Sequence, residues 1–357
     1  MQILKLTANN HSEVIATACQ VLAAGGLVIY PTETVYGIGV DATNPQAVEK
    51  LLKYKTRREG KPLSVAVKNQ AMAEQYVELT DQAKNFYQKF LPGPYTIVSQ
   101  GKNQVAPFVE SEFGTLGIRI PDFPLITDLV AKFNKPVTAT SANASGKKRP
   151  YTIQDIFDHI SDKQKNLLDL VIDAGKLPPN EPSIVVDTTL STPLEVRGSL
   201  STEKTKNFLT KSTKETKNLA GKLMLKNWNQ VKEKGLVIGL NGKLGTGKTI
   251  FTQGVANFLN INQPITSPTY TYMNQYEFNR HQITGILHHL DVWKIDSQAA
   301  WSLLNVPNLV QPNNIVIIEW WQQVKDYWPT DLPIDLEISI SEVEGDLSAR
   351  EIKVSEQ

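Results

Sequence analysis

Short runs rich in apolar residues alternate along the chain with segments of helical periodicity. In the first half, residues 27–30 and 63–67 have the length and apolar content of strands, whereas residues 12–24, 45–54 and 80–90 place apolar side chains at helical spacing. Alternating strands and helices are typical of α/β proteins, in which helices cover the faces of a sheet. The hydrophobic pattern therefore predicts the α/β class.

A polar stretch near the middle of the chain interrupts this pattern. Residues 199–217 are rich in serine, threonine and lysine, and each side of the stretch has its own apolar runs. A chain of 357 residues exceeds the usual size of one domain. We therefore expect a first domain at residues 1–200, a polar, lysine-rich linker at 201–217 and a smaller second domain at 218–357.

The second half begins with the pattern of a strand, a glycine-rich loop and a helix. An apolar run at 236–240 leads into the sequence GKLGTGKT, and helical periodicity follows at 250–259. In such a P-loop, glycines let backbone N–H groups surround phosphates, the lysine reaches the outer phosphates and the hydroxyl faces Mg²⁺. The candidate ATP ligands in this loop are Gly242, Gly245, Gly247, Lys248 and Thr249.

Two later apolar strands of the second half end in acidic residues. Asp291 lies in the run ILHHLDVWKID and Glu319 in NNIVIIEWW. A P-loop protein needs such a group to position its metal, so Thr249, Asp291 and Glu319 form the candidate Mg²⁺ site. The alternative is that both carboxylates are merely solvated at strand ends. Trp320 and Trp321 are expected to continue the strand after Glu319, with one of them facing outward or toward the nucleotide.

Composition restricts the class of protein. Charged residues make up 20% of the chain and the net charge is +1, so anion binding must depend on local clusters. Cys19 is the only cysteine, which excludes an internal disulfide and fits a reducing, cytoplasmic setting. The sequence has no apolar run of membrane-spanning length and no signal-peptide pattern, so we expect no membrane partner.

The first half carries cationic and hydroxyl side chains directly after its predicted strands. An arginine inside an apolar strand, such as Arg119, must be paired or face a cleft, because an unpaired buried charge is costly. The sequence shows no nucleophile–base pair and no metal cluster here. The set suits an anionic ligand with several phosphates, and the alternative is a scattered basic surface. Its members are Lys55, Arg57, Lys61, Arg119, Ser141, Asn143, Ser183 and Arg197.

Several motifs within residues 4–200 resemble, in family order, the YrdC/TsaC family of threonylcarbamoyl-adenylate synthases. They are PTETVYG, KTRREGKPL, LPGPYT, GIRIPD, TSANASG, the PSIVVD strand and EVRG. The resemblance implies a twisted open sheet with helices and a basic cleft. It also implies the conversion of L-threonine, bicarbonate and ATP to threonylcarbamoyl-AMP and pyrophosphate.

The same resemblance assigns roles to individual residues of the first half. It implies that Thr34, Arg119 and Ser183 contact threonine or its carbamate. The residues that it implies for the ATP phosphates and ribose are Lys55, Arg57, Lys61, Thr115, Ser141, Asn143 and Arg197. A general base for the threonine amine cannot be identified from these motifs.

From about residue 208 to the end, the P-loop, SPTY, HLDVWK and IEW resemble TsaE, the small P-loop ATPase of tRNA threonylcarbamoyladenosine biosynthesis. The resemblance implies an α/β NTPase domain in which Thr249 and Glu319 hold Mg²⁺ and Asp291 assists. It also implies that Thr216 lies near the nucleotide, and Arg350 matches a basic position near the family's C-terminus.

Two departures from the TsaE pattern concern ATP turnover. Lys243 stands where the family usually has aspartate, which adds a positive charge beside the phosphate loop. Trp293 and Lys294 stand where the family has tyrosine and arginine, and lysine cannot reproduce the planar fork of arginine.

Together, the two resemblances imply one bifunctional chain for tRNA modification. The first half would supply threonylcarbamoyl-AMP. The second would hydrolyse ATP in support of TsaD/TsaB-like transferase subunits, which act on the tRNA adenosine next to the anticodon, so that tRNA itself is an indirect or weak partner. The alternatives are a non-catalytic RNA-binding module in the first half and a nucleotide sensor with little turnover in the second. A small-molecule kinase is a weaker alternative, because about 140 residues leave little room for an acceptor pocket and a lid.

Overall fold

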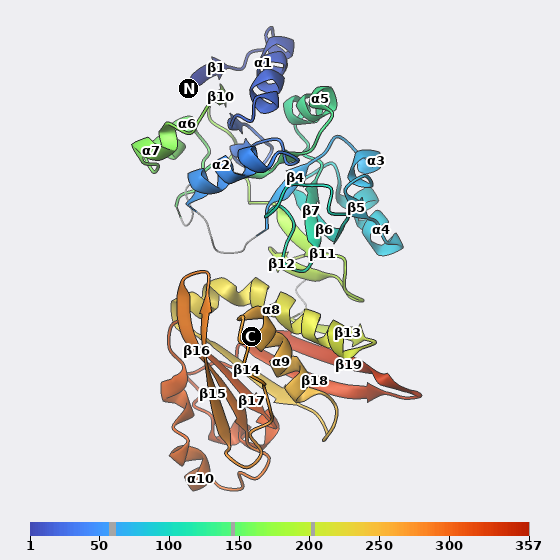
Figure 1. The fold of residues 1–357 in the computed structure, drawn as a ribbon, viewed down its shortest axis with the longest axis vertical. Coiled ribbons are helices and arrows are strands. Elements are labelled where there is room, and N and C mark those ends of the chain that lie inside the picture. The colour runs from blue at the N-terminus through green and yellow to red at the C-terminus, as the bar shows by residue number, and fades with distance from the viewer. Residues whose placement is uncertain (57–61, 144–146, 201–203, 357) are drawn as a thin grey trace. The chain divides into compact units, whose positions relative to one another are not determined.

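The computed structural model describes residues 1–56, 62–143, 147–200 and 204–356. The chain divides into a first unit, Met1–Thr189 with Pro193–Leu200, and a second unit, Leu190–Thr192 with Ser201–Gln357. Each unit combines sheets with helices (Figure 1), which confirms the predicted α/β class. Among the described residues, no helix is both long and apolar enough to cross a membrane.

The described strands of the first unit form two sheets. The first has the order β1 (Gln2–Lys5), β10 (Leu170–Asp173), β2 (Val28–Tyr30), β3 (Gly37–Gly39) and β9 (Thr140–Ser141). The second has the order β12 (Leu194–Arg197), β11 (Ile184–Asp187), β6 (Tyr95–Gly101), β7 (Thr115–Arg119), β4 (Ser64–Ala66) and β8 (Val137–Thr138), with β5 (Val77–Glu78) paired to β6. The helices of this unit are α1 (His11–Ala23), α2 (Pro45–Lys55), α3 (Gln70–Ala73), α4 (Asp81–Phe90), α5 (Pro124–Phe133), α6 (Ile153–Phe157) and α7 (Asp162–Lys165).

The strands of the first unit divide into two sheets, and one short segment connects them. β8 pairs with β4 in the second sheet, and β9 pairs with β3 in the first. Between them, the Thr138 N–H donates to the Val40 carbonyl, whereas the Ala139 N–H donates to that of Ser64. Because successive N–H groups of an extended chain point to opposite sides, this segment bonds to both sheets.

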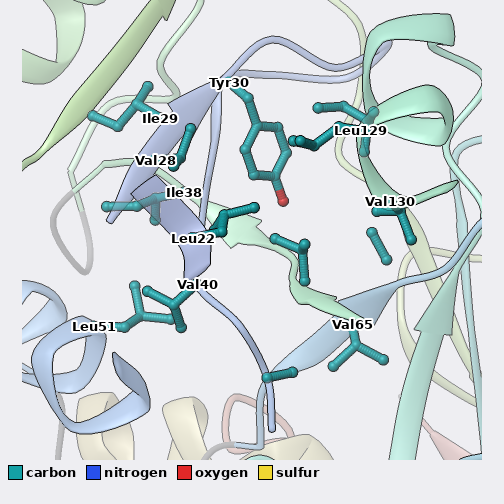
Figure 2. Close-up of a cluster of buried hydrophobic side chains, with 14 of the residues drawn as sticks. Leu22, Val28, Ile29, Tyr30, Ile38, Val40, Leu51, Val65, Leu129 and Val130 are labelled. Atoms are coloured by element: carbon teal, nitrogen blue, oxygen red, sulfur yellow. The ribbon is translucent and has the colours of Figure 1, made fainter. Parts of the chain in front are cut away.

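Buried side chains of β2 join helices to the first sheet. In Figure 2 the Tyr30 ring lies beside Leu129 of α5, and Leu22 of α1 lies on the same side of the strand. These three residues are at most 1% exposed. The Tyr30 hydroxyl donates a 2.9 Å hydrogen bond to the Thr138 carbonyl, and burial raises the pKa of this hydroxyl above its ordinary value. Tyr30 therefore fixes the end of β2, just before the PTETVYG loop.

Strands from residues 204–356 form the sheet of the second unit. Its order is β13 (Thr205–Thr210), β19 (Asp346–Glu356), β18 (Leu336–Val343), β14 (Leu236–Asn241), β17 (Ile315–Glu319), β16 (Ile283–Asp291) and β15 (Met273–Arg280). The central strands β18, β14, β17 and β16 run parallel, so their carboxyl ends share one edge. β18 and β19 pair antiparallel and form a hairpin at the end of the sheet-forming segment.

Helices cover both faces of this sheet. α8 (Thr213–Lys234) and α9 (Lys248–Phe258) pack side by side on one face (Figure 1). A Cβ added at Gly254 of α9 would lie 2.7 Å from the Lys217 backbone of α8, so the two helices approach closely there. The other face packs against an aromatic cluster that includes Trp301 and Trp328. Its elements are α10 (Gln298–Leu303), η1 (Val306–Leu309), η2 (Trp321–Gln323) and η3 (Lys325–Tyr327).

The expected linker at 201–217 is wrong over most of its described length. Residues Thr205–Thr210 form β13, which pairs with β19 at the opposite end of the second unit, and α8 begins at Thr213. The segment is polar because β13 is an edge strand of which Phe208 and Thr210 are buried. An edge strand with one solvated face is rich in polar residues, as a linker is, so its sequence alone does not distinguish the two.

Candidate functional sites

Strand β7 contributes polar residues to the first candidate site. Thr115, Gly117 and Arg119 alternate with the core residues Leu116 and Ile118, so they share the opposite face of the strand. Gly117 lies between the other two polar residues, and its lack of a side chain lets neighbouring side chains approach the strand. The sequence-predicted residues Thr115 and Arg119 therefore lie on one face of one strand.

Neighbouring strands add hydroxyl groups above Gly117. A Cβ at this position would lie 2.9 Å from Cγ2 of Thr96 and 3.1 Å from Oγ of Ser64, so both side chains converge there. Thr96 Oγ1 is 3.3 Å from Ser183 Oγ, and Arg197 donates to that oxygen at 2.7 Å. We call the residues Ser64, Thr96, Thr115, Arg119 and Ser183 the polar face of the second sheet.

An ion pair joins this face to the PTETVYG loop. Arg119 Nη2 lies 2.6 Å from Glu33 Oε1, and the two side chains are 10% and 15% exposed. The loop is held by Thr32, whose hydroxyl donates to the Val35 carbonyl and accepts from the Thr34 N–H. Thr34 is buried and directly follows Glu33, the residue that pairs with Arg119.

Lys55 connects α2 to the turn after β9. Its Nζ donates to the carbonyl oxygens of Ser141 and Asn143, both at 2.7 Å, and the residue is 3% exposed. The Asn143 side chain donates in turn to the Lys147 carbonyl. Three predicted ATP ligands thus lie together, whereas predictions for Arg57 and Lys61 lie outside the described residues.

The P-loop has the strand–loop–helix order that the sequence predicts. Gly242 has a φ of 146°, in the region that favours glycine, and a Cβ there would lie 2.4 Å from the Ile340 carbonyl oxygen. Lys248 Nζ donates to the carbonyls of Gly242 and Lys243 and lies 4.0 Å from the centre of the Trp320 ring. Burial lowers the pKa of Lys248, and the charges of Glu319 and Asp291 oppose this shift.

The two candidate metal carboxylates meet beside the P-loop. Asp291 and Glu319 are register partners at the ends of the parallel strands β16 and β17. Thr249 Oγ1 donates to Glu319 Oε1 at 3.0 Å, while Ser267 and Thr269 donate to Asp291 Oδ2. No group of three or more acidic, histidine or cysteine ligands occurs in the described part of the chain. A hydroxyl and two carboxylates fit Mg²⁺ that takes its remaining ligands from phosphates and water.

Trp320 and Trp321 leave the strand, so the prediction that they alternate in it is wrong. β17 ends at Glu319, Trp320 has a φ of 65°, and Trp321 begins η2. The left-handed backbone turns the chain directly after the carboxylate, and Asn241 accepts the Gln322 N–H at 2.9 Å. Trp320 consequently lies against Lys248, and Trp321 is buried.

Two of the remaining predicted residues lie at the edges of the second site. Arg350 Nε donates to the Thr246 carbonyl of the P-loop at 2.8 Å. Thr216 is buried in α8, and its hydroxyl lies 2.9 Å from that of Thr210. A contact between Thr216 and nucleotide stays a prediction.

Glu33 and His289 are candidate site residues that sequence reasoning missed. His289 is fully buried, and its Nε2 lies 2.8 Å from Oε1 of Glu319. The alternation of β16 puts His289 on the same face as Asp291, which the sequence HLD could have indicated. Glu33 lies inside a recognised motif, but only tertiary structure reveals its pairing with Arg119.

The two protein-family models that match the chain meet near residue 200, where the two structural units also divide. The Sua5/YciO/YrdC family model, described as "Telomere recombination", matches residues 20–199. The model of "Threonylcarbamoyl adenosine biosynthesis protein TsaE" matches residues 210–352.

Curated relatives resemble the first half. A protein of Methanocaldococcus jannaschii is 37% identical over 186 residues, which are 52% of this chain and 86% of the relative. The threonylcarbamoyl-AMP synthase of Photobacterium profundum is 34% identical over 151 residues, 42% of this chain and 82% of the relative.

Solved structures share the fold. Sua5 of P. abyssi complexed with L-threonine has a TM-score of 0.53 at 18% identity, over 89% of this chain and 92% of that one. E. coli YciO has a TM-score of 0.51 at 23% identity, over 56% of this chain and 96% of that one. At these identities the likeness concerns the fold alone.

Proposed function

Because this chain belongs to the Sua5/YciO/YrdC family, we propose that its first unit is a threonylcarbamoyl-AMP synthase. It would convert L-threonine, bicarbonate and ATP to threonylcarbamoyl-AMP and pyrophosphate. The names of the curated relatives support this reaction. The structural observation that carries it is the polar face of the second sheet, which combines Thr115 and Arg119 of β7 with the hydroxyl groups of Ser64, Thr96 and Ser183 from neighbouring segments.

The proposed chemistry is adenylation by positioning. The carbamate oxygen attacks the α-phosphorus of ATP, and pyrophosphate leaves with the negative charge. Cationic groups stabilise that charge best when they are already oriented before the reaction. Lys55, held by two carbonyl groups, and Arg197, held by Ser183, are oriented in this way. Arg57 and Lys61 are proposed to act with them.

For the second unit we propose ATP binding and hydrolysis in support of a threonylcarbamoyl transferase. The TsaE family match supports this role. Backbone N–H groups of the P-loop and Lys248 would hold the phosphates. Thr249, Glu319 and Asp291 would hold Mg²⁺, which neutralises charge on the β- and γ-phosphates when it is bound. The transferase subunits would be TsaD/TsaB-like, and tRNA would be their substrate.

One assay tests both units of the 357-residue chain. Pyrophosphate and orthophosphate are measured from the same ATP reaction, with threonine and bicarbonate added singly and together. We expect pyrophosphate only when both are present, and orthophosphate independently of them. Pyrophosphate release without threonine, or none under any condition, would overturn the synthase proposal. An absence of orthophosphate at saturating Mg²⁺ would instead favour a nucleotide sensor in the second unit.

A further inference from the structure

The Glu33–Arg119 pair has unused hydrogen-bonding capacity on both sides. Among the described residues, Glu33 Oε2 and Arg119 Nε are buried atoms without a hydrogen-bond partner, although Glu33 Oε1 and Arg119 Nη2 are only 2.6 Å apart. Buried polar atoms without partners are costly, so their presence at a candidate site calls for a ligand. The two side chains keep 15% and 10% of their surface exposed, so the pair lies partly at the surface although these two atoms are buried.

The backbone holds Glu33 in place independently of its ion pair. The Asn180 side chain donates to the Glu33 carbonyl at 2.7 Å, and the Thr32 hydroxyl accepts the N–H of Thr34. The titratable groups known to face the Glu33 carboxylate within the described residues are Arg119 of β7 and Tyr30 of β2. The Tyr30 hydroxyl donates its proton to the Thr138 carbonyl. The Glu33 carboxylate is therefore the group of this pair that can accept a proton from a ligand.

An arginine next to a carboxylate matches the two charges of a free α-amino acid. The guanidinium can receive the substrate carboxylate through its unused donor, and the Glu33 carboxylate can receive the ammonium group beside it. Thr34 follows in the same loop, and Ser183 lies on the polar face that carries Arg119. A ligand held in this way presents its amino nitrogen to Glu33.

We propose that Glu33 is the general base for the amino group of threonine, an inference that rests on the synthase function proposed above. Glu33 takes one proton from the ammonium group and leaves a neutral amine. The nitrogen bonds to the carbon of bicarbonate, the C–OH bond breaks, and the hydroxyl leaves as water with a second amine proton. Threonine carbamate forms, and the Glu33 carboxyl returns its proton to solvent.

The test compares the wild-type 357-residue chain with Glu33→Gln in two directions of the reaction. The amide keeps an oxygen for Arg119 but cannot take a proton. In the forward direction at neutral pH, we expect kcat for pyrophosphate release to fall by about 10²- to 10⁴-fold, the range of general-base contributions. The loss should shrink as pH rises, because free threonine then supplies its own neutral amine.

The reverse reaction isolates the phosphoryl step. Threonylcarbamoyl-AMP and pyrophosphate give ATP without removal of an amine proton, so Glu33→Gln should retain this rate within a few-fold. Equal losses in both directions would show that Glu33 only positions Arg119, and undiminished forward activity at neutral pH would also overturn the proposal. Glu33→Asp, which keeps the base, should recover part of the forward rate and provides the second variant if the amide is unstable.

Glu181→Gln is the matched control. Glu181 follows Asn180 in the sequence, and its exposed carboxylate pairs with Arg149. This variant should leave both directions unchanged. If wild type itself forms no pyrophosphate from threonine and bicarbonate, the synthase function fails before any variant is compared. If wild type is active and Glu33→Gln equals it, only the inference about Glu33 fails.

Discussion

Individual buried charges organise both candidate sites. Lys55 and Lys248 each point their ammonium group at two backbone carbonyls, in the turn after β9 and in the P-loop respectively. A buried ammonium group held by carbonyls fixes the backbone around it, because leaving either side unpaired costs the desolvation of that group. Both lysines therefore fix the backbone of the loops in which they are predicted to bind phosphate.

Replacing Lys55 by methionine tests this shaping role in the first unit. The Lys55→Met variant leaves the Ser141 and Asn143 carbonyls without their donor, so the free energy of unfolding should fall by about 2 kcal/mol or more. We expect kcat/KM for pyrophosphate release to fall by about 10²-fold. Urea unfolding and the pyrophosphate assay measure the two effects.

Lys53→Met is the control on the same helix. Lys53 is largely exposed and pairs with Glu49, so its loss should change stability by no more than about 0.5 kcal/mol and leave activity intact. If the two variants show the same stability and activity, the proposed role of Lys55 in holding the Ser141 and Asn143 carbonyls is wrong.

Substitution of His289 tests how Glu319, the candidate metal carboxylate of the second unit, is oriented. In His289→Asn, Glu319 keeps its bond from Thr249 but loses the contact with the imidazole. Loss of such an outer contact lowers metal affinity or turnover by about 10- to 100-fold. We expect kcat for ATP hydrolysis and the Mg²⁺ affinity to fall while KM for ATP changes little.

The neighbouring His288 provides the matched control for this variant. It is also buried, but its Nε2 contacts Asn314 instead of a site carboxylate. His288→Asn should alter stability without the selective loss of turnover. Parallel losses of kcat in both variants would assign the effect of His289 to packing.

At the scale of elements, the sequence predicts what depends on local pattern. The P-loop and the apolar strand that contains Arg119 follow from neighbouring residues, and the structure has both. Pairing partners cannot be predicted in this way. Thr205 of β13 pairs with Ser355, far along the chain, and the polar sequence of that edge strand resembles a linker.

The same limit explains what sequence reasoning missed in the sites. The contact of Glu33 with Arg119 and that of His289 with Glu319 each join residues on different elements. The division of the first unit into two sheets depends on the carbonyls that Thr138 and Ala139 reach. Such choices follow from tertiary packing, which a local pattern does not contain.

Close packing of α8 against α9 provides a prediction about elements. A Cβ at Gly254 would lie 2.7 Å from Cβ of Ala220 and from the Lys217 backbone. Gly254→Ala must therefore push the helices apart and should lower the free energy of unfolding of the second unit by about 1–3 kcal/mol. Asn257→Ala, at an exposed position of α9, should change it by no more than about 0.5 kcal/mol. Equal midpoints in urea for both variants would contradict the close approach.

At the scale of the whole molecule, the chain carries two units, each with its own core, and two proposed ATP sites. The proposed nucleotide site at the P-loop and the proposed adenylate site at the polar face use separate sets of residues. Linking two proteins that serve one pathway raises the effective concentration of each near a shared partner without requiring that one site control the other. Independence of the two sites is thus the simplest expectation.

Lys248→Ala separates independence from coupling. Removal of the ammonium group deprives the P-loop of its phosphate ligand and of the bonds to Gly242 and Lys243, so nucleotide binding by the second unit should be lost. Threonine-dependent pyrophosphate release should remain at the wild-type rate, while threonine-independent orthophosphate release disappears. Isothermal titration should find one fewer nucleotide site per chain. A fall in adenylate synthesis with the first unit still folded would mean that nucleotide at the P-loop regulates the synthase, because the substituted side chain belongs to the other unit.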